Sequence, residues 1–84
     1  MKKECTKLVI HYYNDVDSDN HFTDKFEWFY PNGDLIFREV RKVQCGEDGK
    51  RTDSFILEDK LKMIQQCCLI IDRSNFTIEE IHHE

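Results

Sequence analysis

Apolar and polar residues alternate through the middle of the chain, over Lys25–Val43, and Pro31–Asp34 interrupts the alternation once. A period of two residues is typical of β-strands with one buried face. Two such runs around a short segment of turn residues predict a β-hairpin. Pro31 presets the negative φ with which a turn begins, and Gly33 accepts the positive φ that closes it.

The register of this hairpin has two solutions. A two-residue turn pairs Phe37 with Trp28 across the strands, which gives one apolar face. The same turn pairs Arg38 with Glu27. A three-residue loop with a bulge is the turn that Pro31 favours, and it shifts the pairing by one residue. Cross-strand matching supports the first solution and turn chemistry the second, so both stay open.

Other segments predict more strands. Thr6–Tyr13 alternates in the same way, with a loop over Asn14–Asn20 behind it. The first hairpin strand is clear over Lys25–Tyr30, and its pattern extends back toward His21–Thr23. After the glycine-containing turn that follows Val43, Arg51–Ile56 predicts a short fourth strand.

The period then changes from two residues to a helical one. Five apolar residues fall at steps of four, three, four and three: Leu57, Leu61, Ile64, Cys68 and Ile71. That spacing predicts one amphipathic helix, and Asp72–Asn75 breaks it. Phe76–His82 fits either a closing strand or a short helix capped by Thr77, and we favour the strand because a two-turn helix is marginal.

These elements predict an α+β fold. We expect a small antiparallel sheet of three to five strands, with one amphipathic helix packed on a face, as a single domain over residues 1–84. Trp28, Phe37 and Leu61 are expected to meet between the sheet and the helix.

Charge narrows the class of partner. The net charge is −5, and an acidic surface repels nucleic acid and anionic lipid. A larger protein with a basic surface is the better match. The longest apolar run near the N-terminus is too short for a signal peptide or a membrane span, so we expect a cytoplasmic protein with its four cysteines reduced and structural.

Acidic residues gather in two predicted loops, with Asp53 close to the second, and are our candidate partner-binding residues. They are Asp15, Asp17, Asp19, Glu47, Asp48 and Asp53. Loop side chains can reach a partner without disturbing the sheet.

The first acidic loop also has the residue types of a metal site. Asp15, Asp17, Asp19 and His21 occupy alternate positions, which an extended chain would project to one side. An EF-hand is excluded because Asn20 replaces the turn glycine and Phe26 the bidentate glutamate. Asp17, Asp19 and His21 are therefore a candidate Zn²⁺ or Mn²⁺ site, and the alternative is a solvated acidic loop.

The other histidines could also contribute metal ligands. His11 lies on the first strand, and His82-His83 are expected to form a frayed polar end.

Motifs for catalysis are missing from the sequence. It contains no glycine-rich phosphate loop, no nucleophile elbow and no His-Glu-x-x-His. We therefore expect a protein that is not an enzyme. The remaining classes are a binding protein, a small metal-binding protein and an orphan structural domain of a larger assembly.

In its size, acidity and single-domain character, the whole chain resembles the phage-encoded anti-CRISPR proteins. No motif carries this resemblance, so it assigns no residue. It implies an inhibitor of an RNA-guided nuclease in the host bacterial cytoplasm, which acts by masking the basic surface where the nuclease binds nucleic acid.

Overall fold

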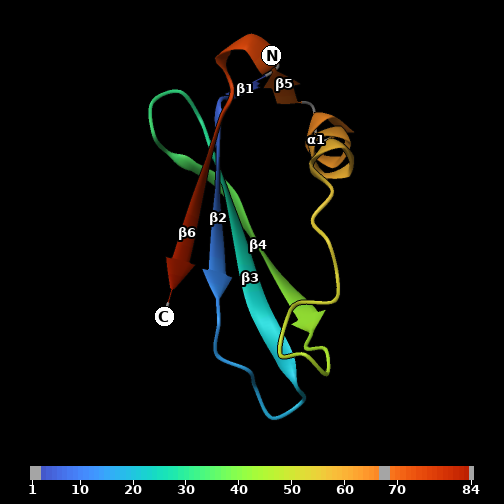
Figure 1. The fold of residues 1–84 in the computed structure, drawn as a ribbon. Helices are drawn as coiled ribbons and strands as arrows, with labels where there is room; N and C mark the ends of the chain where they lie inside the picture. Colours follow the sequence, from blue (N-terminus) through green and yellow to red (C-terminus); the bar gives the residue numbers. More distant parts are fainter. Residues whose placement is uncertain (1–2, 67–68, 84) are drawn as a thin grey trace.

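A four-stranded sheet forms the body of the molecule (Figure 1). In this computed structural model, which describes residues 3–66 and 69–83, the strand order is β4-β3-β2-β6. The strands are β2 (Lys7–Tyr13), β3 (His21–Phe29), β4 (Leu35–Gln44) and β6 (Thr77–His83). The molecule is elongated, with extents of 46 × 22 × 21 Å. The predicted α+β class is confirmed.

A smaller unit lies at one end of the sheet. It contains a helix, α1 (Leu57–Gln66), a short parallel pair, β1 (Lys3–Cys5) with β5 (Leu69–Ile71), and a 3-10 turn, η1 (Arg73–Asn75). We did not predict β1. Ile71, expected on the helical stripe, belongs instead to β5, because Leu69–Ile71 pairs its backbone with Lys3–Cys5. Cys67 and Cys68 lie outside the described residues.

The hairpin combines the two predicted registers. Near the turn, the N–H of Gly33 donates to Tyr30 at 2.9 Å, and Phe29 pairs with Leu35, as the three-residue loop requires. The register then shifts by one residue between Trp28 and Phe29. Beyond that irregularity Trp28 pairs with Phe37, as the two-residue turn predicted. The β-bulge therefore satisfies both the turn chemistry and the cross-strand pairing.

The predicted fourth strand over Arg51–Ile56 is wrong. Only Arg51 forms a bridge, with Cys45, and the chain then leaves the sheet and runs along it toward α1 (Figure 1). Beyond Arg51 side chains hold the segment to β4 in place of a backbone ladder, since Arg41 donates to the carbonyl of Ser54 at 3.0 Å and pairs with the Asp53 carboxylate.

The closing strand is confirmed, and the helical alternative is wrong. The expected frayed end is also wrong for His82 and His83, because both are paired in β6. β6 runs parallel to β2, however, so the sheet is mixed rather than antiparallel throughout. The path of the chain explains why β6 is parallel to β2. Because η1 lies at the end of the sheet where β2 begins, β6 begins at that end too (Figure 1).

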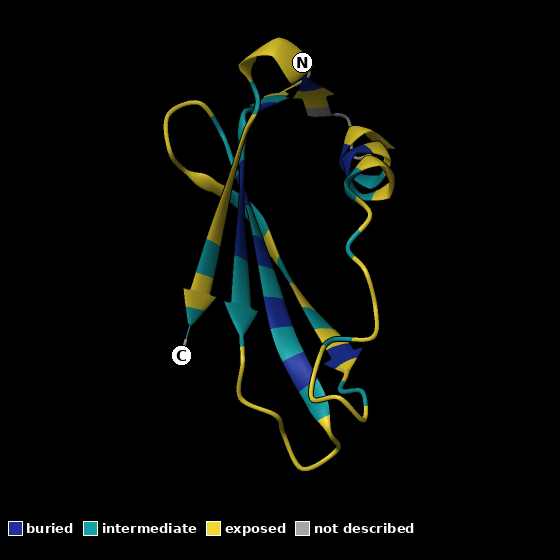
Figure 2. Ribbon diagram, viewed as in Figure 1, coloured by how far each residue is buried: buried dark blue, intermediate teal, exposed yellow. Residues whose placement is uncertain are grey.

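The core lies between the sheet and α1 (Figure 2). We call this side of the sheet the inner face and the opposite side the outer face. Leu8 and Trp28 of the inner face are fully buried, and Leu61 and Ile64 of α1 belong to the same cluster. Phe37 packs against the cluster with its ring 6.0 Å from that of Trp28. The expected meeting of Trp28, Phe37 and Leu61 is confirmed.

Candidate functional site

The loop between β2 and β3 is organised around one carboxylate. Asp17 Oδ1 accepts the N–H of Asp19 at 3.0 Å and the N–H of His21 at 2.9 Å. Asn20 takes the positive φ that closes the turn. Because Asp17 is the first residue of the turn that Asn20 closes, its side chain can accept N–H groups that lack backbone partners in the loop.

The other oxygen of Asp17 faces a cation, since Lys42 Nζ lies 3.3 Å from Oδ2. The His21 backbone hydrogen bond and then the Lys42 ammonium hold the pKa of Asp17 below its usual range. Asp17 is therefore committed to the loop itself.

A second acidic turn follows β4. The N–H of Gly46 donates to the carbonyl of Lys50 at 2.8 Å, and Gly49 supplies the positive φ. Asp48 Oδ1 accepts the N–H of Lys50 at 3.0 Å, which leaves its other oxygen on the surface.

These two loops lie side by side. The N–H of Cys45 donates to the carbonyl of Asn20 at 2.9 Å, and Asn20 Nδ2 returns a bond to the carbonyl of Cys45 at 3.3 Å. Figure 1 shows both loops at the end of the sheet away from α1. The chain thus brings together four acids that make no ion pair among the described residues, which we call the acidic end: Asp15, Asp19, Glu47 and Asp48.

Asp53, the sixth predicted partner-binding residue, has a different setting. Its carboxylate pairs with Arg41, and the hydrogen bond from that guanidinium lowers the pKa of Asp53. Two of the six candidates, Asp17 and Asp53, are therefore engaged within the chain.

The structure does not assemble the candidate metal site. Within the described ranges, no three His, Cys, Asp or Glu side chains converge as metal ligands would. Asp17 already accepts two N–H groups and pairs with Lys42, so it has little capacity left for a cation. Zinc binding by Asp17, Asp19 and His21 stays a prediction. Titration of the untagged protein with zinc ions tests it, and the His21→Ala variant is the control.

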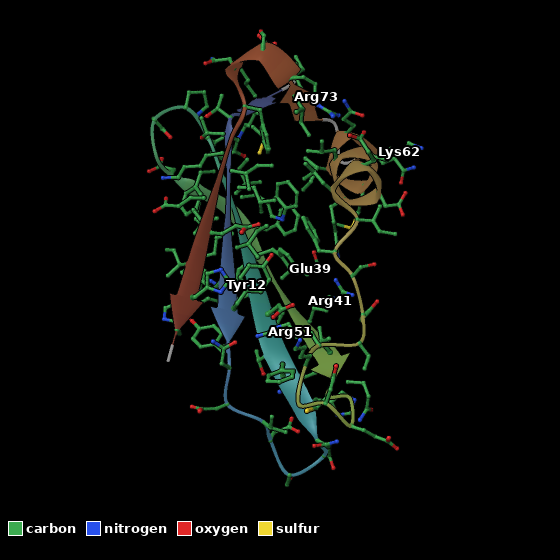
Figure 3. The ribbon with its side chains drawn as sticks, viewed as in Figure 1. Tyr12, Glu39, Arg41, Arg51, Lys62 and Arg73 are labelled. Atoms are coloured by element: carbon green, nitrogen blue, oxygen red, sulfur yellow. The ribbon has the colours of Figure 1, made fainter. Side chains whose placement is uncertain are left out.

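A buried ion pair that the sequence did not reveal lies on the inner face. Asp24 is 3% exposed and pairs with Arg51, which also donates to the carbonyl of Tyr13 at 2.8 Å. Figure 3 shows Arg51 reaching toward the sheet beside Tyr12. Burial raises the pKa of Asp24, and the Arg51 and Arg41 cations oppose that rise without cancelling it. The pair fastens the segment after β4 to the sheet.

The outer face carries a chain of four polar side chains. Arg38 Nη2 donates to Glu27 at 2.8 Å, Glu27 pairs with His11 Nε2, and His11 Nδ1 lies 2.9 Å from His83 Nε2. A carboxylate can only accept, so His11 donates its Nε2–H to Glu27. The alternation of side chains along each strand predicts that these residues lie on one face. Their contacts with one another depend on how the strands are paired in the sheet.

The described cysteines have structural settings. Cys5 is fully buried, and burial raises the pKa of its thiol, which disfavours the reactive thiolate. Cys45 lies at the junction of the two acidic loops and is a free thiol.

The described helices are too short or too polar to cross a bilayer. Comparison with known protein families, with curated proteins and with solved structures finds no match to this chain.

Proposed function

We propose that this chain is a non-catalytic binding protein whose acidic end contacts a basic surface of a larger protein. The observation that carries the proposal is the joining of two acidic loops, 25 positions apart at the Asn20–Cys45 contact, into one end of the sheet. Four carboxylates that form no ion pair within residues 3–66 and 69–83 concentrate negative potential there, and such a patch speeds association with a positive surface.

Hydrogen bonds within the acidic end support a rigid presentation of these loops. Hydrogen bonds between Asn20 and Cys45 hold the loops together, and the Asp17 carboxylate fixes the first of them. Loops whose backbone is already ordered lose less entropy when they bind.

The resemblance to anti-CRISPR proteins supports one partner class. The proposed partner is an RNA-guided nuclease in the bacterial cytoplasm, and the proposed effect is inhibition by occupation of its nucleic-acid channel. Such channels are positively charged and track a nucleic-acid backbone, so an acidic protein can compete for them.

The test is a binding titration against a panel of RNA-guided nucleases at two salt concentrations. Each nuclease is used free, loaded with guide RNA, and loaded with guide and target. We expect binding that weakens as salt screens the charges and that is lost when target DNA fills the channel.

Charge reversal locates the contact. Asp15→Lys with Asp19→Lys, or Glu47→Lys with Asp48→Lys, should slow association by about tenfold or more. The matched control is Asp34→Lys with Asp59→Lys, the same change of charge at exposed positions outside the acidic end. Equal binding by all three variants, or no binding to any nuclease of the panel, would refute the proposed function.

A further inference from the structure

β6 is an edge strand. β2 lies on one side of it, and no strand of residues 3–66 or 69–83 lies on the other. The N–H of Thr77 donates to the carbonyl of Thr6 at 3.0 Å, so the backbone groups of Thr77 point toward β2. Since these groups alternate in direction along a strand, those of Ile78, Glu80 and His82 point away from the sheet.

This alternation restricts how another strand can join. In an antiparallel ladder, facing residues either exchange both hydrogen bonds or exchange none, and the two kinds of pair alternate. The residues of β6 able to bond outward are Ile78, Glu80 and His82. A second β6 can therefore join only in a register that places even-numbered residues opposite even-numbered residues.

In one such register the sequence is complementary to itself. When the pairing is centred on Ile81, Glu80 faces His82 of the second copy, and Glu79 faces His83. Centring on Glu80 sets that carboxylate against its own copy, and centring on His82 sets imidazole against imidazole. An imidazole N–H can donate to a facing carboxylate, whereas two facing carboxylates repel and have no proton to share. The register centred on Ile81 is therefore the complementary one.

The single chain already holds these side chains in place. The His82 ring stacks on Tyr12 with 4.9 Å between centroids, and the His83 ring stacks on Tyr13 at 4.3 Å. Glu79 Oε2 lies 3.1 Å from Lys7 Nζ. Because the imidazoles are already ordered, little further ordering is needed to pair β6 with another strand.

We propose that the outer edge of β6 is a self-association site, at which a second copy of this chain adds its own β6 antiparallel in the register centred on Ile81. The two four-stranded sheets become one continuous sheet. Pairing even with even residues keeps the inner faces of both copies on the same side, with a two-fold axis perpendicular to the sheet at Ile81. The site is independent of the acidic end and of the proposed function.

Analytical ultracentrifugation of the purified chain tests the proposal, up to about 1 mM protein so that a weak dimer is populated. We expect a reversible monomer–dimer equilibrium. Glu80→Lys removes the Glu80–His82 pairs, and His82→Glu sets carboxylates against each other, so each should weaken the dimer by about tenfold or more. The double variant E80K/H82E, and an equimolar mixture of the two single variants, should restore it, because Lys then faces Glu.

Two further variants separate this edge from general effects. Glu47→Lys carries the same charge change as Glu80→Lys in a distant loop and should leave the dimer unchanged. His82→Pro removes an N–H that points outward, so it should give a monomer with the circular dichroism spectrum of the native chain. Should His82→Pro unfold the chain, the charge-swap variants decide alone. A monomer at every concentration, or a dimer indifferent to Glu80→Lys and His82→Glu, would overturn the proposal.

Discussion

The guanidinium of Arg51 and the carboxylate of Asp24 form an ion pair beneath the segment that leaves β4, although 27 positions separate them in the sequence. The Arg51 side chain is 21% exposed and that of Asp24 is 4% exposed. Arg51 also bonds the carbonyl of Tyr13 and the side chain of Asn14. One arginine therefore joins three segments.

Removal of Arg51 should destabilise the fold strongly. Arg51→Met leaves the Asp24 carboxylate buried without its cation, and loss of one partner from such a pair costs about 3–5 kcal/mol. The double variant R51M/D24N should lose less than the sum of the two single variants. Urea denaturation monitored by Trp28 fluorescence measures all three, and strict additivity would show that the pair is not coupled.

Acidification should weaken the network on the outer face. Burial alone would raise the pKa of Glu27, but hydrogen bonds from Arg38 and His11 outweigh it and hold this pKa below its usual value of 4.5. The folded pKa is thus lower than the unfolded one. The stabilisation is fully present above about pH 4.5 and is lost as the pH falls through the folded pKa.

Glu27→Gln is the matching variant. It should lower the free energy of unfolding by about 1.5–3 kcal/mol at pH 7, the range for hydrogen bonds to a charged group. Its stability should also depend less on pH below about 4.5 than that of the native chain. Glu47→Gln, in an exposed loop, is the control and should change neither. If the stability of Glu27→Gln falls at low pH as steeply as that of the native chain, other carboxylates cause the acid dependence.

Truncation of the core should separate packing from hydrogen bonding. Leu61→Ala should cost about 2–5 kcal/mol and Trp28→Ala about 3–5 kcal/mol, from lost burial and the cavity left behind. The Nε1–H of Trp28 is buried without a partner among the described residues. Trp28→Phe should therefore cost clearly less than Trp28→Ala in chemical denaturation. Equal losses would show that a phenyl ring does not fill the space that the Trp28 side chain leaves.

Asp17 and Asp15 should differ, although both were predicted as exposed loop acids. Asp17→Ala removes an acceptor of two backbone N–H groups and should lower the melting temperature at pH 7. Asp15→Ala should leave the melting temperature unchanged. Differential scanning fluorimetry compares them, and equal melting temperatures would show that the loop keeps its shape without the Asp17 carboxylate. For this reason Asp17 is unsuitable for charge reversal in the binding experiment.

Local patterns in the sequence predicted the local structure. The alternation around Trp28 and the turn at Pro31–Asp34 predicted the hairpin, and the change of period at Leu57 predicted α1. Each depends on residues close together in the chain. The parallel direction of β6 could not be predicted, because a strand has the same alternation in either direction and the path of the chain decides.

The site was only partly predictable for the same reason. Acidic composition identified both loops of the acidic end, but their contact depends on the pairing of Asn20 with Cys45. His11 and Glu27 were visible on predicted strands, yet their pairing needed the register of β2 against β3. Short-range structure follows from spacing, whereas long-range pairs follow from the assembled topology.

The topology also sets an order in which the chain can fold. β2, β3 and β4 form an antiparallel meander whose strands are joined by short loops, so little entropy is lost when they meet. β6 joins the remaining edge of β2 only after closing a much longer loop, since Thr6 and Thr77 are 71 positions apart. Contacts so distant in sequence slow folding. Until β6 arrives, the free edge of β2 presents an apolar strand to other chains, and this interval is when aggregation threatens the protein most.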